Sequence, residues 1–159
     1  NITIDEHLDI DLLVNDYYLV KQALDGFSAT NNRYDDGENR ILNYVIINNK
    51  KVLFDFRIIG DNYYDINFQK KLLETREKHK NFYIPNKENH LYSLIYHAIV
   101  HKPNISNSYK KVFLEHGILE KNINKQYLVN MLNNFMKQNN YNYVKPEPSV
   151  GFFINPKEN

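Results

Sequence analysis

Two short, otherwise apolar segments of the chain carry aspartates at positions where a buried β-strand would have none. The first is residues 8–14 (LDIDLLV), and the second is residues 51–59, where Asp55 stands among apolar neighbours. A carboxylate in a buried strand is costly unless a cation or hydrogen-bond donors compensate it. One such acid in each of two strands therefore suggests that the strands meet at one polar site.

The spacing of the acids indicates a cation site. Asp9 and Asp11 are two residues apart, which places them on one side of a strand, about 6–7 Å apart along it. A hard divalent cation relieves the repulsion between them, and Mg²⁺ is commonly held by carboxylates together with substrate phosphates. The alternative is an edge strand with solvated aspartates. Arg57 shares a face with Asp55, and either contacts a phosphate or pairs with Asp55.

The pattern along the chain predicts a strand and a helix, then a hairpin, then a mostly helical second half. Asn15 or Asp16 is expected to cap the first helix and Asp65 the second. The expected strands are residues 8–14, 41–47, 51–59 and a short extended piece at 82–84; the expected helices are residues 16–24, 65–79, 87–102, 108–116 and 125–138.

These elements indicate an α+β fold, in which a small mixed β-sheet with flanking helices is followed by a helical subdomain. We place the α/β core in residues 1–84 and the helical subdomain with its extended tail in residues 85–159.

Composition narrows the class of protein. The 159 residues carry a formal net charge of +1, which argues against a nucleic-acid partner, and they include no cysteine, which excludes disulfides, thiolate metal sites and a cysteine nucleophile. No apolar run approaches the roughly 18 residues that a membrane span requires. We expect no membrane partner and a cytoplasmic location.

The segment LDIDLLV resembles the acidic motif of the nucleotidyltransferase superfamily with the polymerase-beta-like fold. The resemblance covers about residues 7–60. It implies that Asp9 and Asp11 are the paired metal ligands and that Asp55 is the third carboxylate, a ligand or general base. It also implies Mg²⁺ as cofactor, a nucleoside triphosphate as substrate, and transfer of the nucleotidyl group to a small hydroxyl or phosphate acceptor. Residues 82–102 are similar to the helical half of nucleotidyltransferase-like proteins linked to sugar or polyol transfer, so a sugar or polyol phosphate is the preferred acceptor.

One element of that family is not found in this sequence. The family has a Gly-Ser turn shortly before the acidic pair, whereas the six residues before His7 include neither glycine nor serine. We therefore expect the chain to be part of a longer one. Two alternatives stay open: a catalytically inactive nucleotidyltransferase-like module for binding or assembly, and an unrelated α+β interaction domain.

Further residues are candidates for binding substrate. Tyr63 or Tyr64 either stacks on a base or sugar or belongs to the core, and Lys102 either attracts phosphate or lies on a solvated face. On a regular helix His90, His97 and His101 form a narrow stripe, which predicts either packing against the sheet or a cleft, with a zinc site as the alternative.

Overall fold

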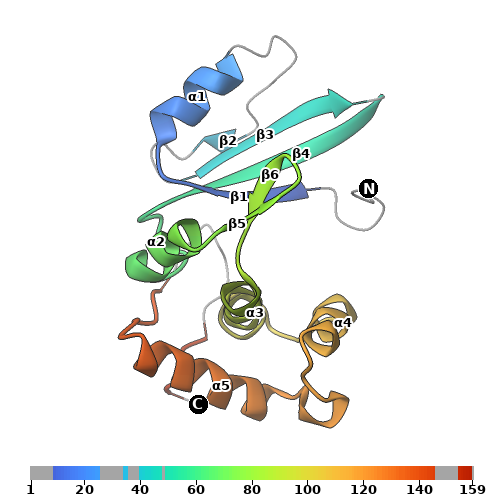
Figure 1. The fold of residues 1–159 in the computed structure, drawn as a ribbon, viewed down its shortest axis with the longest axis vertical. Helices are drawn as coiled ribbons and strands as arrows, with labels where there is room; N and C mark the ends of the chain where they lie inside the picture. Colours follow the sequence, from blue (N-terminus) through green and yellow to red (C-terminus); the bar gives the residue numbers. More distant parts are fainter. Residues whose placement is uncertain (1–8, 26–33, 36–39, 48, 146–153, 159) are drawn as a thin grey trace. The chain divides into compact units, whose positions relative to one another are not determined.

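A four-stranded mixed sheet forms in the first part of the chain (Figure 1). This computed structural model describes residues 9–25, 34–35, 40–47, 49–145 and 154–158. The strands are β1 (Asp9–Val14), β2 (Tyr34–Asp35), β3 (Arg40–Ile47) and β4 (Lys50–Ile58), in the spatial order β1-β4-β3-β2. β1 runs parallel to β4, whereas β3 is antiparallel to both β4 and β2. The mixed sheet and the α+β class were predicted correctly.

Local sequence explains these elements. β3 and β4 are rich in β-branched and aromatic residues, which suit a pleated strand. Between them Asn49 has a φ of 62°, a conformation that asparagine tolerates in tight turns. Helix α1 (Tyr17–Asp25) follows β1, and the Asp16 carboxylate accepts a hydrogen bond from the Leu19 amide at 3.0 Å. The predicted cap of this helix is therefore confirmed.

The chain forms two compact units, residues 1–61 and 62–159. The second unit is mostly helical and includes a small β-hairpin. Its elements are α2 (Ile66–Glu74), β5 (Glu77–His79), β6 (Phe82–Ile84), α3 (Lys87–Tyr96), a π-helix η1 (His97–His101), α4 (Asn107–Glu115), a 3-10 helix η2 (Glu120–Asn122) and α5 (Lys125–Gln138). Among the described residues, no helix is both long and apolar enough to cross a bilayer.

Aromatic rings form much of the core of the second unit. Phe68 of α2 is fully buried, and its ring packs edge-on against Phe135 of α5 and lies 5.3 Å from Tyr141. Leu128 and Leu132 of α5 are fully buried as well, as the apolar stripe of this helix predicted.

Helix α2 is shorter than the sequence predicted. It ends at Glu74 instead of continuing to His79, and residues 77–79 form β5. No apolar residue follows Leu73 until Phe82, so a longer helix would have no inner face to bury. The Thr75 hydroxyl donates to the Lys71 carbonyl at 2.7 Å and accepts from the Asn89 amide group at 2.7 Å, which stabilises the helix end.

A buried carboxylate joins the start of α2 to the segment after α5. The Asp65 side chain accepts from the Asn67 and Phe68 amides at 2.8 and 3.4 Å, as the predicted cap requires. Its second oxygen accepts from the Asn142 amide at 2.9 Å, 77 residues along the chain. Asp65 is therefore both a helix cap and a tertiary contact.

Replacing this carboxylate will destabilise the protein more than removing an ordinary cap. We expect Asp65→Ala to lower the free energy of unfolding by about 2–4 kcal/mol, because it removes the cap and leaves the Asn142 amide without its acceptor. The matched control is Asn124→Ala, which removes a cap of α5 that bonds only nearby backbone groups, the Tyr127 amide and the Lys121 carbonyl, and costs about 1 kcal/mol. Urea denaturation measures both values, and equal losses would contradict the tertiary role of Asp65.

Candidate metal and nucleotide site

The parallel pairing of β1 with β4 brings two of the predicted carboxylates together. Asp11 and Asp55 are Cα partners in this pair. Partners in a parallel pair project to the same face of the sheet, and neighbouring strands are about 4.8 Å apart. Asp11 and Asp55 are therefore adjacent acids on one face, as the sequence predicted for two strands that meet at one polar site.

The two acids differ in their exposure. Asp55 lies on β4, inside the sheet, and only 5% of its surface is exposed. Asp11 lies on β1, at the sheet edge, and is exposed. The edge position agrees with the alternative of solvated aspartates for β1, but that alternative does not explain the buried Asp55. Asp9 has its Cα opposite Leu53, and its side chain lies outside the described part of the structure.

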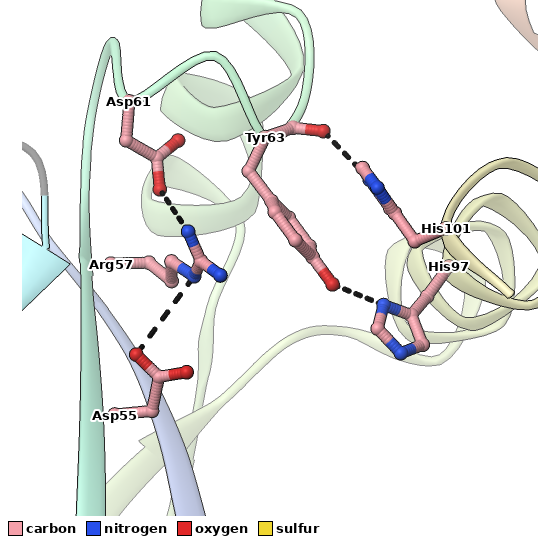
Figure 2. A network of polar contacts seen from close by, with 6 residues as sticks. All are labelled: Asp55, Arg57, Asp61, Tyr63, His97 and His101. Atoms are coloured by element: carbon pink, nitrogen blue, oxygen red, sulfur yellow. Dashed lines mark hydrogen bonds and ion pairs between the residues drawn. The ribbon is translucent and has the colours of Figure 1, made fainter. Parts of the chain in front are cut away.

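Arg57 supplies positive charge beside Asp55 (Figure 2). Its Nε atom is 3.9 Å from an Asp55 carboxylate oxygen, and its Nη1 atom is 3.5 Å from an Asp61 carboxylate oxygen. Figure 2 shows the guanidinium group between the two carboxylates. The expected pairing of Arg57 with Asp55 is therefore present, and Asp61 completes it. Both aspartates are 5% exposed, so this cation offsets the cost of burying two negative charges.

Asp61 was not predicted as part of this site. It stands in the turn after β4, with Gly60 before it at a φ of 92°. The sequence has an acid four residues after an arginine at the end of an apolar strand, and Gly60 between them indicates a turn. On a strand that spacing predicts no contact; the turn brings the two side chains together.

The donor set suits a hard divalent cation. Magnesium takes oxygen ligands, keeps several water molecules, and is bound by one or two carboxylates plus substrate phosphates. Asp11 and Asp55 provide two such carboxylates on one face. Among the described side chains, which do not include Asp9, no three acidic or histidine groups form a cluster that would hold a metal. These residues fit a magnesium site in which Asp11 and Asp55 supply two ligands and water and substrate phosphate supply the others.

The other residues predicted to bind substrate, Tyr63 and Lys102, belong to the second unit. The Tyr63 ring stacks on His101 with 4.1 Å between centroids and 9° between planes, so one ring face is already covered. Its hydroxyl shares a hydrogen bond with His97, and its carbonyl accepts from His101 at 3.1 Å (Figure 2). Lys102 is exposed after η1 and lines a small cavity of about 180 Å³ together with Lys125.

The three histidines of the predicted stripe divide into two groups. His90 contacts His116, with 3.0 Å between Nδ1 and Nε2, whereas His97 and His101 both contact Tyr63. Two helical turns separate His90 from His97 along the helix axis, so the two histidines contact different partners. The sequence predicted one regular helix over residues 87–102, whereas residues 97–101 form the π-helix η1.

No known family, curated protein or solved structure matches this chain significantly. The functional proposal therefore depends on the acidic motif and on the geometry of the β1–β4 pair.

The His90–His116 pair makes stability sensitive to acid. Burial lowers the pKa of His90 below its ordinary value of 6.5, and His116 lowers it further. Burial also lowers the pKa of His116; Lys87 acts in the same direction and Glu115 opposes it. Below pH 6.5 the unfolded chain therefore binds more protons than the folded one at these two residues, so their contribution to stability is present above pH 6.5 and is lost as pH falls.

We expect the free energy of unfolding, measured in urea between about pH 7.5 and 5, to depend less on pH in a His90→Gln, His116→Gln double variant than in the wild type. The control is His79→Gln, which changes an exposed histidine of β5 and should retain the wild-type slope. An unchanged slope in the double variant would show that the pair does not control this titration.

Proposed function

We propose that this protein is a metal-dependent nucleotidyltransferase that moves a nucleotidyl group from a nucleoside triphosphate to a small hydroxyl or phosphate acceptor. The observation that carries the proposal is the pairing of Asp11 with Asp55 on neighbouring parallel strands. The likeness of LDIDLLV to the acidic motif of that superfamily supports it, and the likeness of residues 82–102 makes a sugar or polyol phosphate the preferred acceptor. The lack of cysteine is consistent with a cytoplasmic location.

In this proposal the carboxylates of β1 and β4 have distinct roles. Asp11, with Asp9 two residues earlier on β1, would hold Mg²⁺, and the exposure of Asp11 leaves room for water and phosphate ligands. When bound, Mg²⁺ would neutralise phosphate charge and polarise the phosphoryl group. Asp55 would be the third ligand of Mg²⁺, or it would accept the proton of the acceptor hydroxyl, a role that requires a carboxylate close to the bound substrate.

Arg57 would serve as a positioning residue. Its two ion pairs restrain the Asp55 side chain on β4, and its positive charge lowers the repulsion that a triphosphate would meet near three acids. Tyr63 and Lys102 belong to the second unit, so a nucleotide contact of either residue stays an expectation from the sequence and is no part of the site on β1 and β4.

A second function deserves a test because of Arg57. An arginine already beside Asp55 and Asp61 is a built-in counter-ion, and such an arrangement can be structural. In that case the protein is a nucleotidyltransferase-like module that binds nucleotide or assembles with a partner without catalysis. Calorimetry with a nucleoside triphosphate, with and without Mg²⁺, together with a pyrophosphate-release assay distinguishes the two, because the module binds without turnover.

The acidic pair can be tested by neutralising one member. We expect Asp11→Asn to weaken Mg²⁺-dependent binding of ATP or another nucleoside triphosphate at least about ten-fold, since even outer-shell partners of a metal contribute that much, and to abolish pyrophosphate release. Glu115→Gln, which removes an exposed acid of α4, is the control and should bind as the wild type does. If Asp11→Asn retains full activity, the assignment of the site is wrong.

A further inference from the structure

The β5–β6 hairpin has two chemically different faces. Its strands pair antiparallel, with Lys78 opposite Tyr83, His79 opposite Phe82 and Glu77 opposite Ile84. Residues that face each other across such a pair project to the same side, and successive pairs alternate. Lys78 and Tyr83 therefore share one face.

The opposite face of the hairpin carries its apolar groups and its acid. Glu77, His79, Phe82 and Ile84 project there, and the rings of His79 and Phe82 are 5.4 Å apart. Glu77 is thus kept away from the side that carries Lys78 and Tyr83.

The face with Lys78 is cationic and aromatic. The Arg76 guanidinium carbon lies 4.9 Å from the centre of the Tyr83 ring, so Arg76 belongs to the same face, and Lys80 follows in the turn. In the part of the chain that the structure describes, no carboxylate forms an ion pair with these three cations. We call Arg76, Lys78, Lys80 and Tyr83 the cationic face.

The cationic face is open to solvent. All six residues of the two strands are exposed, and Tyr83 keeps 59% of its surface accessible. In Figure 1 the hairpin extends beyond helices α2 and α3, which it connects. An exposed tyrosine with a cation against one side of its ring presents the other side to a partner.

The turn of the hairpin retains a lysine at a strained position. Lys80 has a φ of 55°, a left-handed conformation that glycine or asparagine adopts at lower cost, and Asn81 stands next to it. Strained residues of this kind cluster at binding and catalytic sites. It adds a positive charge at the tip of the cationic face.

We infer that the cationic face binds single-stranded nucleic acid, with a base stacked on Tyr83 and with Arg76, Lys78 and Lys80 at the phosphates. Sequence-tolerant binding of single strands uses this combination of an aromatic platform and nearby cations. The net charge of +1 predicted no such partner because it averages the whole chain, whereas the hairpin register separates the cations from Glu77. The inference does not rest on nucleotidyl transfer.

Fluorescence anisotropy with labelled twelve-residue oligo-dT and oligo-U tests the inference on the intact protein. Three phosphate contacts on a single strand predict a fall in affinity of about 20-fold when salt rises from about 50 to about 200 mM. Tyr83→Ala should weaken binding about five-fold or more through lost stacking. Absence of binding, or binding that Tyr83→Ala leaves unchanged, would overturn the inference.

Lys80→Gly separates binding from folding. Glycine relieves the positive φ, so the melting temperature should stay the same or rise while affinity falls and the salt dependence becomes shallower. Two variants serve as controls and should bind as the wild type does: Glu77→Gln on the opposite face, and Lys121→Ala, which removes an exposed lysine of η2.

Anionic phospholipid vesicles test the alternative that the cationic face binds a membrane surface. Binding to vesicles but not to oligonucleotides, with loss in Phe82→Ala rather than Tyr83→Ala, would assign the hairpin to a membrane surface and overturn the inference.

Discussion

The register between β1 and β4 is the constraint on which the proposed site depends. Side chains alternate along a strand, so a slip of one residue would place Asp11 beside Phe54 or Phe56 and turn the acids to opposite faces. Apolar residues oppose such a slip. Val52 and Ile58, near the two ends of β4, are almost completely buried on the face opposite Asp55, and a slip that turned β4 over would move them out of that buried face. The same apolar pattern that forms the strand therefore also aligns the two carboxylates.

The second constraint is the burial of two negatively charged carboxylates in the first unit. Asp55 and Asp61 are both nearly inaccessible, and two unpaired carboxylates there would destabilise the unit. Arg57 compensates both, because its planar group has several donors that point in different directions. Arg57 therefore stabilises the two buried acids, while Asp11 at the sheet edge is exposed and can be reached by a cation or a phosphate.

Polar groups also organise the helical unit, although its core is aromatic. The Asp65 carboxylate connects the first turn of α2 to the chain after α5, and two histidine contacts connect α3 and η1 to other segments of the unit. His97 and His101, at the two ends of η1, both contact Tyr63, while His90 of α3 contacts His116. The β5–β6 hairpin differs from the rest of the unit, since it contributes little to this core and leaves its side chains in solvent.

The sequence by itself determined the elements whose signals are local. Period-two alternation, caps at Asp16 and Asp65, and apolar stripes predicted β1, β3, β4, β6 and most helices, but not β2 or β5. Helix α5 was predicted at its observed bounds, residues 125–138. It also singled out Asp11, Asp55 and Arg57, because charged residues in apolar strands need partners wherever the strands lie.

Only the tertiary structure decided which groups meet. Pairing of β1 with β4 across 44 residues depends on contacts between distant segments, and so do the contacts of His90 with His116 and of His101 with Tyr63. The turn that brings Asp61 to Arg57 is local, but the strand pattern before it does not predict the contact. The early end of α2 has a local cause, the lack of apolar residues between Leu73 and Phe82, and the contact of Thr75 with Asn89 and the pairing of residues 77–79 with β6 stabilise it. Local propensity carries no information about such partners, because the free energy that selects them is gained only when the segments pack.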